Sequence, residues 1–212
     1  MLSLDKMAAL FKTLWLCGLL SLSAPLWAQD VYEQGYAAYQ KRDYQSAKAL
    51  YEQAAKAGDG KAMNSLGTLY ELGQGVPVNY GQALRWYEQA QEAGSVAATG
   101  NLGALHERGL GTPKNYFYAI TYYFMGLNQG DAKSMNNLGV MAGTDEILPF
   151  NLPASWALLG LAKDYGDPYA SDNQKHATGV MTAAQKQEAR RFYQQLKNSP
   201  QRTDTLVDYL GF

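Results

Sequence analysis

A group of residues recurs every 36 positions along most of the chain, and this period constrains the fold more than any other feature. Glycines keep the interval through four occurrences, at Gly58, Gly94, Gly130 and Gly166. Other residue types follow the same interval, at Leu66-Gly67, Leu102-Gly103 and Leu138-Gly139, at Pro77, Pro113 and Pro149, at Asn79, Asn115 and Asn151, and at Ala47, Ala83 and Ala119. Independent columns that share one period indicate a repeat protein, in which each unit packs on the next.

Residues 62–94 form the clearest unit, and their pattern predicts two helices joined by a loop. Apolar residues recur with helical spacing at Ala62, Leu66, Leu69 and Tyr70 in the first helix, and at Tyr80, Ala83, Leu84, Tyr87 and Ala90 in the second. Gly67 lies in the middle of the first helix, where glycine is less favourable than alanine, so we expect a neighbouring helix to approach it too closely for a Cβ atom. Gly73 fits a helix end that needs positive φ, and Asn79 fits the N-cap of the second helix.

Two amphipathic helices per unit cannot bury their apolar stripes alone, so the units must stack into an all-α solenoid. The solenoid is predicted to cover residues 29–197, with units at about 31–58, 59–94, 95–130 and 131–166. After the last unit we expect a polar connecting stretch, then a capping helix at about 182–196, and then a tail, 198–212, whose apolar end folds back or docks elsewhere. The loop of the last unit, residues 143–151, lacks the glycines of the other loops and is either a local contact point or a decayed repeat.

Residues 1–28 are predicted to be a secretory signal peptide rather than part of the solenoid. Lys6 and Lys12 precede a short apolar run, and Ala28 is the small residue after which we expect cleavage. The run is shorter than the ~20 residues that a spanning helix needs, although an uncleaved anchor stays open as an alternative. Two starts are also open, at Met1 and Met7. We therefore expect a periplasmic or secreted protein with no stable membrane span after cleavage.

The composition argues against several classes of function. The 18 basic and 19 acidic residues give a formal net charge of −1, so the chain has no basic field for nucleic acid. Cys17 is the only cysteine and lies in the predicted signal peptide, which leaves the mature chain without disulfides, thiolate nucleophiles or cysteine metal ligands. No Ser-Lys or Ser-His arrangement at the spacing of a nucleophile motif is visible. We therefore predict that the protein is not an enzyme and carries no metal or cofactor.

The repeat columns resemble those of the Sel1-like repeat family, a relative of the tetratricopeptide repeat. The resemblance spans residues 31–196 and is most specific in the middle two units. The residues that define the repeat are predicted to be structural: Leu66, Gly67, Tyr70, Ala83, Tyr87, Gly94, Leu102, Gly103, Tyr123, Gly130, Leu138, Gly139 and Gly166. Asn79 stands where the family usually has Asp, which keeps the cap, and His106 stands in the aromatic Tyr70 column.

The resemblance implies a right-handed α–α superhelix that binds proteins or peptides. Secreted bacterial members of the family are mostly adaptors and regulators at the cell envelope, so we expect an adaptor of that kind with a protein or peptide partner. Some cysteine-rich secreted members are linked to β-lactam binding. An enzyme acting on cell-wall or β-lactam amides is therefore the alternative, although this chain lacks those cysteines.

The predicted binding site is the concave face of the solenoid, formed by first-helix residues that lie off the apolar stripe. These residues are Asn64, Thr68, Glu71, Asn101, Glu107, Asn136, Asn137 and Val140. Side-chain amides suit a peptide backbone because they both donate and accept hydrogen bonds. Glu71 and Glu107 occupy equivalent places on adjacent helices, about 8–10 Å apart. That spacing overlaps the range of an inverting glycosidase pair, but we favour an exposed solenoid position without catalytic role.

An aromatic cluster at the start of one second helix is denser than the repeat requires. Tyr116 and Tyr123 match packing columns, whereas four further aromatic residues are surplus, Phe117, Tyr118, Tyr122 and Phe124. We interpret the surplus residues either as packing between units or as apolar anchors for a partner. His106 falls in a packing column and is predicted to be a core residue. His176 has no partner at ligand spacing, so no metal site is predicted there.

Overall fold

The computed structural model describes residues 24–144 and 148–211, and within these ranges every regular element is a helix. The helices are α2 (Leu26–Gln40), α3 (Tyr44–Lys56), α4 (Gly60–Leu72), α5 (Tyr80–Glu92), α6 (Val96–Arg108), α7 (Tyr116–Gln129), α8 (Ala132–Ala142), α9 (Leu152–Asp164), α10 (Ala170–Val180), α11 (Ala183–Asn198) and α12 (Arg202–Leu210). The predicted all-α class is confirmed. Residues 1–23, which hold most of the predicted signal peptide, lie outside the described ranges. Because α2 begins at Leu26, the predicted cleavage site after Ala28 falls inside its first turn.

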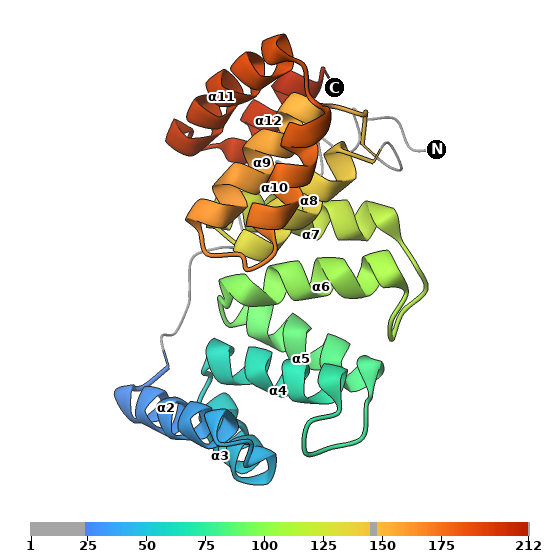
Figure 1. Cartoon of the computed structure of the whole chain (residues 1–212). Coiled ribbons are helices and arrows are strands. Elements are labelled where there is room, and N and C mark those ends of the chain that lie inside the picture. The colour runs from blue at the N-terminus through green and yellow to red at the C-terminus, as the bar shows by residue number, and fades with distance from the viewer. Residues whose placement is uncertain (1–23, 145–147, 212) are drawn as a thin grey trace.

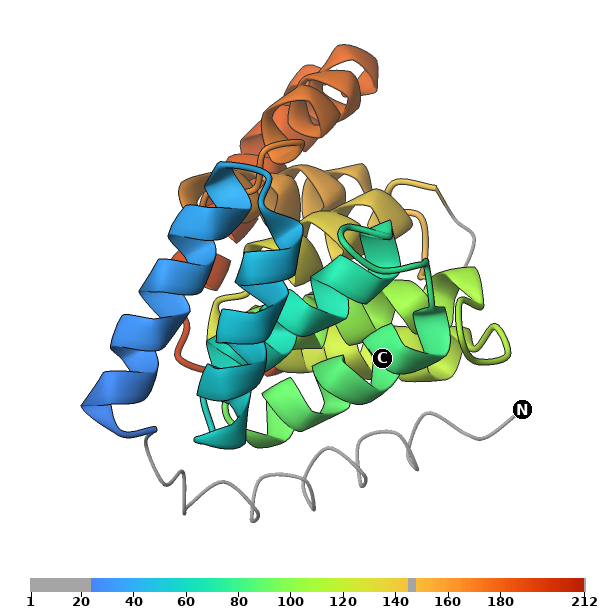
Figure 2. The ribbon, with the colours of Figure 1, turned by 90° about the horizontal axis from the view of Figure 1, so that it is seen from below.

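Successive helices form four pairs, α2–α3, α4–α5, α6–α7 and α8–α9, and each pair packs on the next (Figure 1). The α2–α3 pair is the outermost unit at one end, as Figure 2 shows from below. First helices also touch one another directly, α4 with α6 and α6 with α8, whereas the second helices make no contact of similar extent. The first helices therefore lie on the inside of the curvature, as expected for the concave side of a solenoid.

Asparagine caps mark the start of the second helix in three of the pairs, at the repeat interval. The side chains of Asn79, Asn115 and Asn151 accept hydrogen bonds from backbone amides two or three residues into α5, α7 and α9, at 3.0, 3.2 and 2.9 Å. Gly73 closes α4 with a φ of 69°, the left-handed conformation that glycine adopts at least cost. The predicted caps and the predicted glycine helix end are confirmed.

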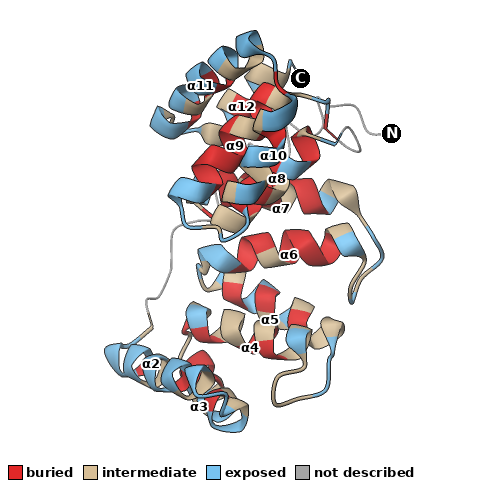
Figure 3. Cartoon of the chain, in the orientation of Figure 1, coloured by how far each residue is buried: buried red, intermediate tan, exposed pale blue. Residues whose placement is uncertain are grey.

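Buried tyrosines of the second helices pack against glycines of the first helices. A Cβ atom on Gly67 would lie 2.5 Å from the Tyr87 ring, and one on Gly103 would lie 2.3 Å from the Tyr123 ring. Figure 3 shows buried residues in each of the helix pairs, and they are most extensive in α6, α8 and α9. The close helix approach predicted at Gly67 is therefore confirmed, and the approaching helix belongs to the same unit.

The stretch after the last unit differs from its prediction, because residues 170–180 form helix α10 rather than a polar connection. Only Ala170 and Ala177 of this helix are buried, so its sequence carries almost no apolar stripe. Side-chain bonds hold it against α9 instead: the Trp156 indole N–H donates to the Thr178 hydroxyl at 2.8 Å. Helix α11, which covers the predicted capping helix, packs on α9.

The tail is not free, because residues 202–210 form helix α12, which docks on α7, α9 and α11. The Thr203 hydroxyl donates to the Phe124 carbonyl at 2.8 Å, and the Thr203 amide donates to Asn128 at 2.8 Å. Leu206 is fully buried in the same cluster as Phe192, whose ring stacks on Tyr209. The open alternatives for the tail are thus resolved: it folds back onto the solenoid.

Candidate functional site

The predicted binding residues lie on the first helices, on the inside of the curvature; we call this surface the inner face. Its residues are Asn64, Thr68, Glu71, Asn101, Glu107, Asn136, Asn137 and Val140. Hydrogen bonds link three of the first helices across this face. Asn101 Nδ2 donates to Asn64 Oδ1 at 2.9 Å, and Lys133 Nζ donates to Asn101 Oδ1 at 2.8 Å. The asparagines therefore orient one another, and each keeps part of its hydrogen-bonding capacity for another molecule.

Asn136 differs from its prediction, because it is buried rather than presented to solvent. Its Oδ1 accepts a 2.9 Å hydrogen bond from Asn173 on α10. Asn137, the next residue, is half-buried and donates from Nδ2 to the Tyr123 hydroxyl at 2.8 Å. The amide of Asn136 thus ties α8 to α10, whereas Asn137 lies at the junction of α6, α7 and α8.

Helix α8 approaches α6 closely because Gly100 has no side chain. A Cβ atom on Gly100 would lie 2.2 Å from Asp131 Oδ2 and 3.1 Å from the Lys133 Cβ. Asp131 is itself buried and caps α8 through the Ser134 amide at 2.8 Å. The inner face is therefore tightly packed where α6 meets α8.

Glu71 and Glu107 accept hydrogen bonds from the buried tyrosines of their own units. The Tyr87 hydroxyl donates to Glu71 Oε2 at 2.7 Å, and the Tyr123 hydroxyl donates to Glu107 Oε2 at 2.6 Å. Burial, followed by the neighbouring carboxylate, raises the pKa of both phenols well above 10, so they stay protonated donors. Glu71 also lies 3.9 Å from Arg108. Each glutamate is thus held by the tyrosine of its own unit. In an inverting glycosidase, by contrast, the two carboxyl groups hold one water molecule between them.

The rest of the inner face is small or aliphatic. The Thr68 hydroxyl donates to the Asn64 carbonyl at 3.2 Å and lies 3.3 Å from the Tyr87 hydroxyl. Val140 on α8 is 40% exposed. The inner face therefore offers one apolar contact next to the polar group formed by Asn137, Tyr123 and Glu107.

Of the four surplus aromatic residues, only one is exposed. Phe124, one of the candidates for a surface anchor, is 3% exposed because α12 packs against α7 at this residue, so the anchor interpretation is wrong for it. Phe117 and Tyr122 are half-buried, and Tyr118 is 51% exposed. The packing interpretation therefore fits three of these side chains, and Tyr118 alone keeps the open surface that an anchor needs.

His106 is buried, as predicted, and its ring stacks on Tyr122 at 5.5 Å and tilts against Tyr118 at 5.3 Å. Its Nδ1 atom has no hydrogen-bond partner, and burial lowers the pKa of the imidazole. His176 is exposed on α10. Within residues 24–144 and 148–211, no group of His, Cys, Asp and Glu side chains could hold a metal ion.

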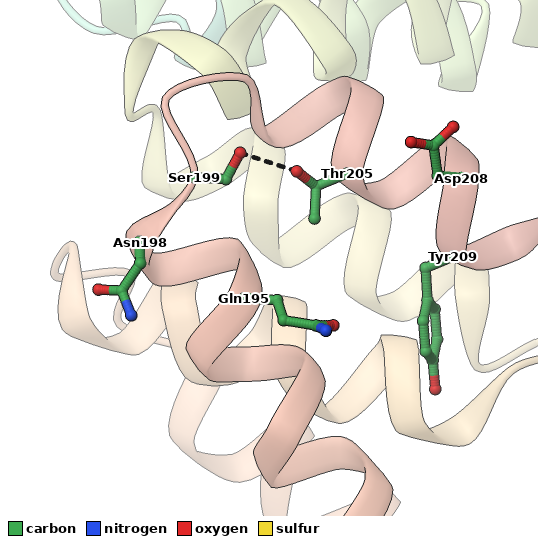
Figure 4. Close-up of a pocket in the computed structure, with 6 residues that line it drawn as sticks. All are labelled: Gln195, Asn198, Ser199, Thr205, Asp208 and Tyr209. Carbon is green, nitrogen blue, oxygen red and sulfur yellow. Dashed lines mark hydrogen bonds between the residues drawn. The ribbon is translucent and has the colours of Figure 1, made fainter.

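A shallow hollow of about 530 Å³ lies between α11 and α12 (Figure 4). It is lined by Gln195, Asn198, Ser199, Thr205, Asp208 and Tyr209. The Ser199 and Thr205 hydroxyls bond to each other at 2.7 Å, and the Tyr209 hydroxyl donates to Glu188. Three of its polar side chains, Ser199, Thr205 and Tyr209, thus bond within the protein.

Two side chains of the inner-face network, Lys133 and Asn173, were missed by the sequence reasoning. Asn173 lies 36 residues after Asn137 and 72 after Asn101, so the repeat column contained a signal for it. Lys133 carried no such signal, because its bond to Asn101 depends on the close approach of α8 at Gly100.

The paired helices, the periodic caps and the glycine–tyrosine contacts define an α-solenoid of helix-turn-helix repeats. The model of the Sel1 repeat matches residues 26–59, 60–95 and 96–131, and the chain belongs to the Sel1 repeat family. The structure adds a fourth pair, α8–α9, after the three matched units. In the part of the chain that the structure covers, no helix is long and apolar enough to cross a membrane.

A solved structure shows the same fold. The crystal structure of a Sel1 repeat protein from Oxalobacter formigenes is 22% identical, covers 79% of this chain and 73% of its own, and superposes with a TM-score of 0.63. The structure of c5321, a protective antigen of uropathogenic Escherichia coli with an SLR fold, is 20% identical and covers 87% of this chain, with a TM-score of 0.46. This chain matches 49% of the c5321 chain. No curated protein matches the sequence.

Proposed function

We propose that this protein is a non-catalytic adaptor that binds a protein or peptide through its inner face. Sel1 repeat proteins are generally adaptors in protein interactions. The observation that carries the assignment to this face is the hydrogen-bonded row formed by Asn64, Asn101 and Lys133 across α4, α6 and α8. Such a row presents oriented amides at intervals along a curved surface, as an extended peptide requires.

The row leaves hydrogen-bonding capacity for a partner. Asn64 uses Oδ1 within the row, so its Nδ2 donors remain available, and Asn101 uses one of the two hydrogens on its Nδ2. Amides that are already held in place lose little side-chain entropy on binding, which favours affinity. The same bonds make the site rigid, so we expect recognition with little change in the backbone.

We also propose that the protein acts outside the cytoplasm, in the bacterial periplasm or beyond the cell. The support is the N-terminal sequence, in which Lys6 and Lys12 precede a short apolar run that ends near Ala28. Determining the mature N-terminus of the protein from fractionated cells tests this proposal. Cytoplasmic protein that retains residues 1–28 would contradict it.

Selection from a random peptide-display library tests binding at the inner face. The wild-type protein should enrich a defined set of peptides, and the double variant Asn64→Ala/Asn101→Ala should lose most of them. The matched control is Gln53→Ala/Gln89→Ala, which removes two exposed amides from the second helices α3 and α5. Thermal melting of all three proteins checks that each is folded. Equal enrichment by wild type and the asparagine variant would place binding elsewhere, and no enrichment by wild type would contradict peptide binding.

A further inference from the structure

Glu71 and Glu107 are equivalent residues of adjacent units, but their second carboxylate oxygens have different surroundings. Each glutamate gives Oε2 to the tyrosine of its own unit. Glu71 Oε1 then faces Arg108 of the next unit, 3.9 Å away. Thus a cation from the following first helix completes the environment of Glu71.

Glu107 has no such cation. The residue 36 positions after Arg108 is Thr144, whose hydroxyl donates to the Met141 carbonyl of its own helix end at 3.3 Å. None of the ion pairs among the described residues includes Glu107. Within residues 24–144 and 148–211, its carboxylate therefore keeps one oxygen without a hydrogen-bond or ion-pair partner, at the place where the preceding unit has an arginine.

The side chains around Glu107 would contact both the aliphatic stem and the charged end of an arginine or lysine. The Tyr123 hydroxyl bridges Glu107 and Asn137, since it donates to the first and accepts from the second at 2.8 Å. Val140 follows Asn137 by one helical turn and is 40% exposed. An arginine or lysine can lay its aliphatic stem on such a residue while its charged end reaches a carboxylate.

We propose that Glu107 is the binding point for an arginine or lysine side chain of a peptide partner, with Val140 beneath the stem and Asn137 beside it. The partner would supply the cation that Arg108 supplies to Glu71. This inference rests on the proposed function, in which the inner face binds a protein or peptide, and adds the chemistry of one anchor residue.

Sequencing the peptides that the wild-type protein enriches from a random display library tests the proposal. An arginine or lysine should be enriched at one fixed position. Glu107→Gln keeps an acceptor for Tyr123 but removes the charge, and should lose that preference and weaken binding of a selected peptide about three- to tenfold. Thr144→Arg leaves Glu107 and its tyrosine bond in place and should block the anchor, as Arg108 does at Glu71. Raising the salt concentration should weaken wild-type binding more than Glu107→Gln binding.

Glu92→Gln removes an exposed carboxylate at the end of α5 and is the matched control; it should keep the wild-type preference. The proposal is overturned if wild type enriches peptides without a preferred basic position, or if Glu107→Gln and Thr144→Arg both keep the preference. In those cases peptide binding itself still stands. If wild type enriches no peptide, the proposed function fails and the anchor fails with it. Thermal melting shows whether each variant is folded. If Glu107→Gln is not folded, Thr144→Arg provides the test alone.

Discussion

The first helix of the second unit passes so close to the second helix that a Cβ atom on Gly67 would lie 2.5 Å from the Tyr87 ring. The same contact recurs in the third unit. In the fourth unit the tyrosine is replaced by Leu159, and a Cβ on Gly139 would lie 2.7 Å from the leucine Cγ. The close approach of the two helices thus recurs from unit to unit, while the residue that packs against the glycine changes.

We predict that Gly67→Ala destabilises the protein by about 1–3 kcal/mol, because the added methyl group must displace a buried ring. The gain in helix propensity, about 1 kcal/mol at most, opposes this loss. Gly179→Ala is the matched control, since a Cβ there meets no atom within 4 Å in α10. It should be neutral or slightly stabilising. Urea unfolding measures the stability of both variants. Equal effects would show that the close contact at Gly67 does not disfavour the added methyl group.

The buried tyrosines predict a loss of stability at high pH. Burial raises the pKa of Tyr51 to about 12 and raises the pKa values of Tyr87 and Tyr123 further. The unfolded chain releases these protons near pH 10, whereas the folded chain retains them. The contribution of these tyrosines to the free energy of unfolding is therefore fully present below pH 10. It falls as the pH rises above 10, by up to about 1.4 kcal/mol per pH unit for each tyrosine.

Urea unfolding between pH 8 and pH 11 measures this loss, and Tyr87→Phe should reduce its slope. At neutral pH, Tyr87→Phe should cost about 1–2 kcal/mol, because Glu71 loses its buried donor. The matched control is Tyr169→Phe, since Tyr169 is 71% exposed. An alkaline slope that is the same in Tyr87→Phe and in wild type would show that the buried phenol is not its source.

His106 predicts a second, acidic loss of stability. Its Nδ1 is buried without a partner, and burial lowers the pKa of the imidazole, so the folded protein favours the neutral ring. The unfolded chain takes up the proton near pH 6.5. The contribution is therefore present above pH 6.5 and is lost as the pH falls from there toward the lower folded pKa.

His106→Tyr tests this, because it restores the aromatic residue found at the equivalent Tyr70. Thermal melting between pH 7.5 and pH 5 should show a smaller acidic loss in His106→Tyr than in wild type. His176→Gln is the control, since His176 is exposed on α10, and it should keep the wild-type profile. The prediction is wrong if both variants follow wild type.

The sequence allowed most of the repeat structure to be predicted, because the period places equivalent residues in equivalent surroundings. Caps such as Asn79 and close contacts such as Gly67 depend on neighbours within one unit. Helix α10 was missed because it buries only Ala170 and Ala177, and an apolar stripe was the signal used to recognise helices.

The 36-residue period does not show the hydrogen bonds of the candidate site, because these bonds join residues whose separation differs from 36. Asn64 and Asn101 are 37 residues apart, one more than the repeat, so their bond joins different columns of adjacent helices. The sequence left the burial of Phe124 open because it depends on α12, where Thr203 lies 79 residues further along the chain. Contacts over such separations are set by docking of whole elements rather than by local pattern.

The docked helix α12 gives the last prediction. Leu206 is fully buried in the cluster that contains Phe192, so Leu206→Ala should destabilise the protein by about 2–5 kcal/mol through lost burial and the cavity that remains. Thr203→Val keeps the shape but removes the hydroxyl that donates to the Phe124 carbonyl, and should cost about 1 kcal/mol. Asp208→Ala, an exposed change on the same helix, is the control and should stay within about 0.5 kcal/mol of wild type.

Urea unfolding followed by circular dichroism measures the three variants, and hydrogen exchange of the α7 amides shows where the effect acts. If α12 is part of the folded core, Leu206→Ala should speed exchange in α7 and α9, the helices on which α12 docks. A large loss of stability with unchanged exchange in α7 would mean that α12 contributes through α11 alone. If Leu206→Ala behaves like Asp208→Ala, α12 is not docked in solution, and Phe124 then becomes exposed and returns to the set of possible partner anchors.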